Sequence, residues 1–183
     1  MNHPEDGGII SIDPNGDRSL IVGTGMNQKL FRVSSKAMCL ASPVWNAMFT
    51  GPYKEATAEE ISLPEAEPNA LLITLRIAHL QFKELPSSLD FQELVNLAAV
   101  CDVYDMVPIV RPFVKEWIRA SEPLAEEIGY EEWLLVAWTF GYPEIFARIA
   151  RRLVLYASTN ADGQCLNEKN KVLEDFIPPG IIG

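Results

Sequence analysis

Apolar and polar residues alternate through the amino-terminal fifth of the chain with the two-residue period of β-strands. The stretch "IISIDPNGDRSLIVG" places apolar runs on both sides of Pro14-Asn15-Gly16, and this turn chemistry predicts a hairpin of two antiparallel strands. After the loop "TGMNQK", the alternation in "LFRVS" predicts a third strand with Phe31 and Val33 on one face. The chain is therefore predicted to begin with β structure.

From Ser35 the apolar residues recur with helical spacing. Two short helices are predicted on either side of Ser42-Pro43, because proline suits a first helical turn. Their inward residues are expected to be Met38, Val44, Trp45, Met48 and Phe49. "EISLP" predicts a short strand, and a further helix begins at Pro68. The apolar stripe of that helix is formed by Leu71, Leu72, Leu75 and Ala78.

The later part of the chain is predicted to be helical. Asp90 and Glu93 have the spacing of a capping box, and the apolar repeat that follows is Leu94, Leu97, Ala98, Cys101 and Tyr104. Pro108 suits the start of the next helix, in which Pro112 predicts a kink or a late start. "EEWLLVAWTFG" and "PEIFARIARRLVLY" predict a helical hairpin broken at Gly141. Its core is expected to contain Trp133, Ala137, Trp138, Phe140, Ile145, Ile149 and Tyr156.

Composition narrows the class of protein. Of the 183 residues 48% are hydrophobic and 22% charged, which favours a folded chain with one main domain. A net charge of −10 argues against direct nucleic-acid binding. The chain has no apolar run long enough for a membrane span and no secretion signal at "MNHPEDGG". Its three cysteines, Cys39, Cys101 and Cys165, fit a reducing compartment. We expect an intracellular protein, cytoplasmic or nuclear.

Three motifs occur in this chain in a characteristic order. "GDRSLIVG" has Asp17, Leu20 and Val22 in the pattern D-x-x-L-x-V. "FRVSSKAMCLASPVWNAMF" and "LAAVCDVYDM" follow, with the pattern positions Phe31, Val33, Met38, Ser42, Trp45, Cys101, Asp102 and Tyr104. In combination these motifs resemble the BTB/POZ domain. The resemblance implies an α+β fold in which a helical cluster caps a small β-sheet, followed by a C-terminal helical hairpin.

The resemblance also implies a division of the chain. Residues 1–8 are expected to be a flexible N-terminus, and residues 9–120 the BTB/POZ domain. Residues 121–157 resemble the helical extension of fungal members, and 158–183 form a tail with little predicted structure. Ser34 and Ser35 replace the His-Lys pair of the family, which leaves open whether Lys36 is the basic partner of Asp17.

The loop "GPYKEA" is the main candidate for partner binding. BTB adaptors of the ubiquitin-ligase scaffold cullin-3 carry a hydrophobic-x-Glu motif in the matching loop, and Tyr53-Lys54-Glu55 matches it here. An exposed aromatic residue beside a charge is a typical interface anchor. The alternative is a structural loop, in which Tyr53 packs against Met48 or Phe49 and Glu55 is solvated.

The N-terminal strand suggests self-association. An apolar arm containing Ile9, Ile10 and Ile12 can pair with a second copy across an exposed strand edge, and the resemblance adds Asp17, Val44 and Trp45 to this dimer interface. The alternative is a hairpin closed within one chain. We expect a homodimeric interaction module, with cullin-3 as a possible partner. A dimeric scaffold or transcription-associated protein without a ligase role is the second hypothesis.

An enzyme, either a hydrolase or an oxidoreductase, is the remote third hypothesis. Gly23 and Gly25 imitate a dinucleotide-binding loop, but Gln28 stands where a third glycine belongs. His3 and His79 lack metal-ligand spacing, and Cys101 lies on an apolar helical face. We therefore expect no catalytic residue, cofactor or metal. The remaining charged cluster, Arg148, Arg151 and Arg152, fits either a solvated helix face or an acidic partner.

Overall fold

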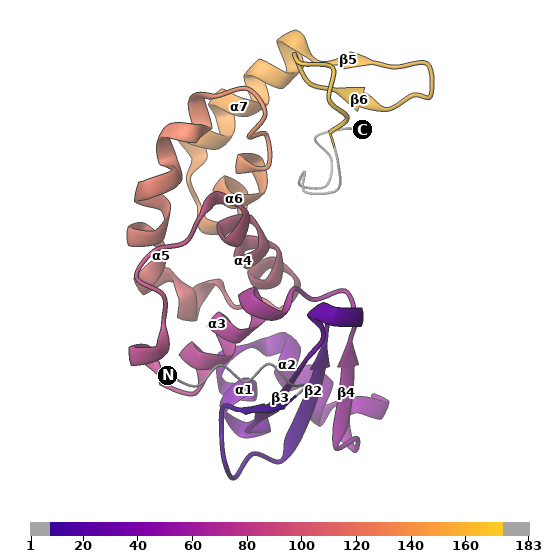
Figure 1. The fold of residues 1–183 in the computed structure, drawn as a ribbon, viewed down its shortest axis with the longest axis vertical. Coiled ribbons are helices and arrows are strands. Elements are labelled where there is room, and N and C mark those ends of the chain that lie inside the picture. Colours follow the sequence, from indigo (N-terminus) through magenta and orange to yellow (C-terminus); the bar gives the residue numbers. More distant parts are fainter. Residues whose placement is uncertain (1–7, 174–183) are drawn as a thin grey trace. The chain divides into compact units, whose positions relative to one another are not determined.

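The computed structural model describes residues 8–173 and has a mixed α+β architecture (Figure 1). Its residues form two compact units. The first runs to Pro86 and includes Val100–Val110; the second contains Ser87–Ala99 and the chain from Arg111 onward. Residues 1–7, predicted to be flexible, and "FIPPGIIG" at 176–183 lie outside the described residues.

The first unit contains a mixed four-stranded sheet with the order β1-β3-β2-β4. Strands β2 (Arg18–Val22) and β3 (Lys29–Val33) pair antiparallel, Leu20 opposite Phe31, as their alternation predicts. Strand β4 (Glu60–Leu63) pairs parallel with β2. The short strand β1 (Ile9–Ser11) pairs parallel with β3, at the edge of the sheet.

The predicted hairpin between the first two strands is wrong. Although the chain turns at Asp13–Gly16, where the Gly16 amide donates to the Asp13 carbonyl at 2.9 Å, β1 pairs with β3 and not with β2. The reason is that β3 and β4 occupy both edges of β2. Where the chain enters the turn, the Ile12 and Asp13 amides instead donate to the Arg32 carbonyl, at 2.9 and 3.1 Å.

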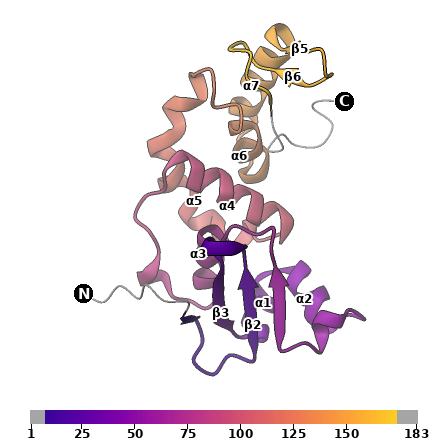
Figure 2. The same cartoon turned by 45° about the vertical axis from the view of Figure 1, so that its right-hand side comes forward.

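One face of this sheet forms the core of the first unit. The alternating strand residues Leu20, Val22, Phe31, Val33, Ile61 and Leu63 are buried, and α1 (Ser35–Ala41) and α2 (Pro43–Thr50) lie on one side of the sheet (Figure 2). Met38, Trp45 and Phe49 are buried as predicted, whereas Val44 and Met48 are only half-buried. Helix α2 therefore leaves part of its predicted core face open to solvent.

Local capping explains where these helices begin. The Ser34 hydroxyl accepts from the Ala37 amide at the start of α1, and the Ser42 hydroxyl accepts from the Trp45 amide at 3.1 Å at the start of α2. Helix α3 (Pro68–Ala78) is capped by the Glu67 carboxylate, which accepts from the Ala70 amide at 2.6 Å. Within α3 the core face differs from the predicted stripe: Ile73, Thr74 and Ile77 are buried along with Leu71 and Leu75, whereas Leu72 and Ala78 are only half-buried.

The next helices begin as the sequence predicts. Helix α4 (Phe91–Val103) has the full capping box: the Glu93 amide donates to Asp90 at 2.8 Å, and the Asp90 amide donates to Glu93 at 2.9 Å. Helix α5 (Val107–Ser121) contains Pro112 in its interior. The helix therefore does not start late. Single-turn 3-10 helices complete the connections: η1 (Gly25–Asn27), η2 (Lys54–Ala56) and η3 (Phe82–Glu84), with the longer η4 (Glu122–Glu126) after α5.

Helices α6 (Trp133–Phe140) and α7 (Pro143–Tyr156) form the predicted helical hairpin of the second unit. Gly141 ends α6 in the left-handed region, with φ of 79°. Tyr156 and Trp138 are exposed, so their predicted core positions are wrong. Trp138 directly follows the buried Ala137 and is rotated off the core face. Tyr156 is the last residue of α7, which at 14 residues is longer than its partner α6, at 8.

A small antiparallel pair follows α7, where no element was predicted. Strands β5 (Ser158–Thr159) and β6 (Cys165–Leu166) are held to the residues before α6 by the buried Glu131. Its carboxylate accepts from the Asn167 side-chain amide at 3.0 Å and from the Gly129 amide at 2.9 Å. Hydrogen bonds to Glu131 thus hold this segment in place, and the sequence carries no apolar periodicity that would predict it. In the described part of the chain, no helix is long and apolar enough to cross a membrane.

Candidate functional site

The loop between α2 and β4 presents Tyr53 on the surface of the first unit. Tyr53 is 58% exposed and directly precedes η2. Its ring lies over Gly51, where a Cβ would come 3.0 Å from Tyr53 Cδ2 and 2.4 Å from the Ala47 carbonyl oxygen. Gly51 thus allows the tyrosine ring to cross the end of α2. Tyr53 and Met48 line one surface groove, so the structural alternative, in which Tyr53 packs against Met48, stays open.

A surface groove of about 480 Å³ lies next to this ring. Helix α2 supplies one wall of the groove with Pro43, Val44, Ala47 and Met48, and the loop supplies Tyr53 and Glu55. Val44 and Met48 are the two residues that the helical pattern assigned to the core but that remain half-exposed. The groove therefore combines an apolar wall with one aromatic ring and one carboxylate.

The three residues of the predicted partner motif have different surroundings. Lys54 Nζ lies 3.9 Å from Glu55 Oε1, and the lysine side chain is 92% exposed. Glu55 is more enclosed, with 25% of its side chain exposed, and lines the groove together with Tyr53. Tyr53 and Glu55 therefore face a common surface that Lys54 does not line.

The predicted dimer residues differ in exposure, and one of them, the half-buried Val44, lines the α2 groove. Ile9 is exposed on the edge strand β1, and Ile10 is half-buried. Ile12 and Trp45 belong to the interior: Ile12 is 4% exposed, and Trp45 stacks with Phe49 and with Tyr104, at ring-centroid distances of 5.4 and 4.6 Å. Side chains buried to this extent offer no surface for contact with a second copy. Ile9 thus carries most of the exposed apolar surface of β1.

Asp17 is fixed by Ser35 and Arg18. The Ser35 amide and hydroxyl both donate to its carboxylate at 2.7 Å, and Arg18 Nη1 lies 3.3 Å from Oδ2. Partial burial raises the pKa of Asp17, but the Ser35 hydrogen bonds and the Arg18 charge outweigh it, and the net pKa is lowered. The sequence left Lys36 open as the basic partner, whereas the structure gives this position to Arg18.

The residues considered for catalysis have structural contacts. His79 Nε2 accepts from the Ser34 amide at 2.9 Å and so links the end of α3 to the start of α1, while Nδ1 donates to the Leu75 carbonyl within α3 at 2.8 Å. Burial raises the pKa of the Cys101 thiol well above its ordinary value. Gly25 begins the 3-10 turn η1, and β3 follows it. Residues 8–173 contain no cluster of three His, Cys, Asp or Glu side chains suited to a metal ion.

Two arginines of the predicted cationic cluster on α7 are engaged within the second unit. Arg148 Nη1 lies 2.9 Å from Glu126 Oε1. Arg152 donates to the Glu126 and Glu127 carbonyls, both at 3.1 Å. Their contacts hold α7 against the segment around η4, whereas Arg151 is exposed. These contacts favour an internal role for Arg148 and Arg152.

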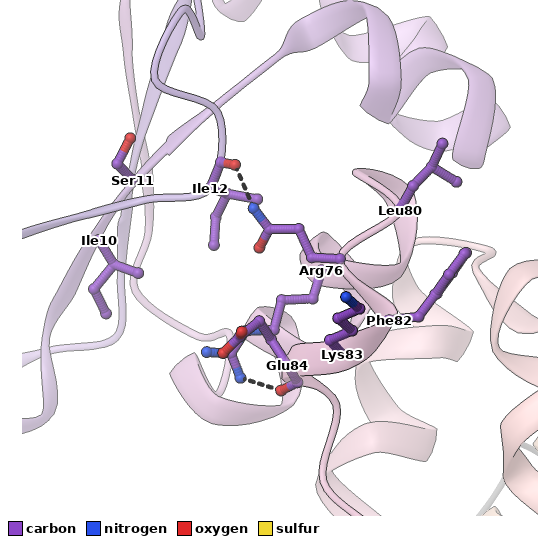
Figure 3. A pocket seen from close by; sticks show the side chains of 9 residues that line it. Ile10, Ser11, Ile12, Arg76, Leu80, Phe82, Lys83 and Glu84 are labelled. Carbon is purple, nitrogen blue, oxygen red and sulfur yellow. Dashed lines mark hydrogen bonds between the residues drawn. The ribbon is translucent and has the colours of Figure 1, made fainter.

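A second hollow, of about 600 Å³, lies beside β1 (Figure 3). The segment from the end of α3 through η3 lines it, together with Ile10, Ser11 and Ile12. Gln81 Nε2 donates to the Ile12 carbonyl at 2.7 Å, and Arg76 Nη1 donates to the Glu84 carbonyl at 2.7 Å. No sequence motif indicates this hollow, because it joins residues 69 positions apart.

No model of a known protein family matches this chain, and no curated protein matches it as a relative. The support for a function therefore comes from the α2 groove, the edge strand and the order of the sequence motifs.

Proposed function

We propose that this chain is a protein-interaction module of the BTB/POZ type that forms a homodimer and binds a partner protein through the α2 groove. The observation that carries the proposal is the position of Tyr53 and Glu55 in one groove with Val44 and Met48. Interfaces concentrate their binding energy in a few aromatic and apolar residues surrounded by polar ones. The groove offers this combination on a small scale.

The BTB/POZ assignment is supported by the order of the elements. An antiparallel pair, β2 and β3, is followed by α1 and α2, by a strand parallel to β2 and by the helices α3 to α5. The three sequence motifs fall on β2, on the segment from β3 to α2, and on α4 with the turn after it. The candidate partner is cullin-3, because the hydrophobic-x-Glu motif of its adaptors corresponds to Tyr53 and Glu55.

A titration of the full chain with the amino-terminal domain of cullin-3 tests this partner. We expect saturable heat that is lost in Tyr53→Ala. Tyr156→Ala is the matched control, because Tyr156 is 60% exposed, close to the 58% of Tyr53, but lies at the end of α7. Removal of a central aromatic anchor typically costs about 2 kcal/mol or more. Absence of heat with the wild-type chain at high concentration contradicts cullin-3 as the partner.

A dimeric scaffold without a ligase role is the second candidate, and the exposed edge of β1 favours it. Ile9 is 57% exposed on an edge strand, and an apolar edge is a common site of pairing with another chain. Light scattering over a dilution series should show a dimer for the wild-type chain and a larger monomer fraction for Ile9→Lys. A wild-type chain that is monomeric at every concentration contradicts homodimerisation.

A further inference from the structure

Arg18 connects the central sheet of the first unit to the loop that carries Tyr53. It is the first residue of β2, and 18% of its side chain is exposed. Its Nη2 donates to the Ala56 carbonyl at 3.1 Å, at the end of η2. The guanidinium carbon lies 5.9 Å from the centroid of the Phe49 ring on α2. One planar side chain thus contacts the strand, the end of α2 and the loop.

Within residues 53–57 the other hydrogen bonds are local, and the next bond to the sheet, from the Ser19 amide to the Glu59 carbonyl, lies at the start of β4. In the described part of the chain, the Ala56 amide donates to the Tyr53 carbonyl at 3.1 Å, and the Thr57 amide donates to the Lys54 carbonyl at 3.4 Å. The Thr57 hydroxyl also donates to the Lys54 carbonyl, at 3.3 Å. These bonds close the turn on itself without fixing it to the sheet. The Arg18 bond to Ala56 supplies that link.

Arg18 is itself held in place. Its Nη1 pairs with the Asp17 carboxylate, which in turn accepts two hydrogen bonds from Ser35 at the start of α1. The polar chain therefore runs from Ser35 through Asp17 and Arg18 to Ala56. A guanidinium group has several donors in one rigid plane, so it can serve the carboxylate and the carbonyl together, which an ammonium group cannot do with the same geometry.

The arrangement has a cost to folding. The Nε of Arg18 is buried and has no hydrogen-bond partner among residues 8–173. A buried donor without an acceptor lowers stability, and an apolar side chain at this position would avoid that loss. Against this cost stands the hydrogen bond that Arg18 donates to the Ala56 carbonyl of the loop.

We propose that Arg18 is a positioning residue that fixes the Tyr53–Ala56 loop, so that Tyr53 and Glu55 are preorganised in the α2 groove for a protein partner. This inference rests on the proposed function of the groove. Preorganisation strengthens binding because the loop is ordered before the partner arrives. The residue acts through the loop and does not itself line the groove.

The test compares Arg18→Met with Arg32→Met. Methionine keeps an unbranched apolar side chain and removes the donors, and Arg32 is an exposed arginine on the neighbouring strand β3. Amide hydrogen exchange should accelerate roughly tenfold at Ala56 and Thr57 in Arg18→Met, since the loop then opens locally. The Ser19 amide, which donates to the Glu59 carbonyl at 2.8 Å between β2 and β4, should keep its protection and so report an intact sheet.

Binding of the cullin-3 amino-terminal domain gives the second readout. The affinity of Arg18→Met should fall roughly five- to tenfold through loss of preorganisation, that of Arg32→Met should stay unchanged, and Arg18→Lys should recover part of the loss. If the Ala56 and Thr57 amides of Arg18→Met exchange at the wild-type rate, the proposal is overturned, whether or not the partner binds. If the wild-type chain does not bind cullin-3, the proposed partner fails, and the exchange rates alone then decide the role of Arg18. If Arg18→Met does not fold, the same comparison is made with Arg18→Lys.

Discussion

Tyr53 depends on a glycine two residues before it. The Gly51 amide donates to the Ala47 carbonyl at 2.8 Å, ending α2, and the Tyr53 ring occupies the space that a side chain at position 51 would need. The backbone of Gly51 has φ of −81°, so close packing and not left-handed geometry requires a glycine here. The absence of a Cβ at Gly51 thus decides where the Tyr53 ring lies.

The variant Gly51→Ala should therefore displace Tyr53 and destabilise the fold. A Cβ would lie 2.4 Å from the Ala47 carbonyl oxygen, and relief of such crowding typically costs about 1–3 kcal/mol. The measurements are the free energy of unfolding in urea and the fluorine NMR signal of 3-fluorotyrosine at position 53. Gly25→Ala is the control: a Cβ there contacts nothing within 4 Å, so it strains only the backbone, which has φ of 58°. A Tyr53 signal that is the same in both variants contradicts the assigned packing.

The lowered pKa of Asp17 makes part of the stability depend on pH. Because the folded-state pKa is below the ordinary value of 3.8, the ionised carboxylate stabilises the folded state above that value, and the contribution is lost as the pH falls below it. NMR titration of the Asp17 carboxyl should give a pKa below 3.8, and Ser35→Ala should raise it, because one donor is removed. In Asp17→Asn the corresponding acid-induced loss of stability should be absent. An Asp17 pKa at or above 3.8 in the wild-type chain contradicts this account.

At the scale of single elements, α2 serves both the core and the surface. Trp45 and Phe49 are four positions apart and face the interior, while Val44 and Met48 have the same spacing one residue earlier and line the groove. The helix is therefore apolar over a wider arc than the core uses. Such a surplus is typical of a helix that also forms a binding surface.

Helix α5 contains a proline that the fold tolerates without breaking the helix. Pro112 lies between the two ends of α5, and its side chain is exposed to solvent. It has no amide hydrogen to donate to the Pro108 carbonyl. Pro112→Ala should raise the free energy of unfolding by about 1–2 kcal/mol, because the restored hydrogen bond outweighs the greater entropy of the unfolded chain. Chemical denaturation measures the change. Pro108→Ala, in the first turn, is the control and should have little effect. A destabilised Pro112→Ala variant would show that the proline has a packing role.

At the scale of the whole molecule, charge opposes self-association. The chain carries a net charge of −10, so two copies repel each other at low salt, whereas the exposed surface of Ile9 on β1 is apolar. A dimer formed through such a surface is held by burial of apolar area and weakened by the charge of its subunits. Salt screens the repulsion without removing the apolar contact.

The proposed homodimer should therefore become tighter as salt is added. Sedimentation velocity at about 0.05 M and about 0.5 M sodium chloride should show the dimer dissociation constant falling several-fold, because the Debye length shortens from more than about 10 Å to less than about 8 Å. The Ile9→Lys chain provides the control, with little dimer at either salt concentration. A dissociation constant that rises with salt would indicate an interface built from opposite charges.

The order of amino acids by itself determined most of the elements of this protein. Local signals account for them: the alternation in β3, the Ser42-Pro43 break, the Asp90–Glu93 capping box and the Gly141 helix end all act within a few residues. The exposed loop at Tyr53 was also predictable, since an aromatic residue after Gly51-Pro52 follows a helix end. These features need no information about distant parts of the chain.

Only the tertiary structure decided which elements pair and which side chains remain exposed. Strand β1 pairs with β3 because β4, about 40 residues later in the chain than β2, occupies the remaining edge of β2. Arg18 contacts Ala56 across a separation of 38 residues, and Glu131 binds Asn167 across 36. Hydrophobic periodicity describes one element at a time. The surfaces that meet in space decide which strand pairs at each edge of β2. They also decide which long-range hydrogen bonds form and which part of an apolar helix face stays exposed.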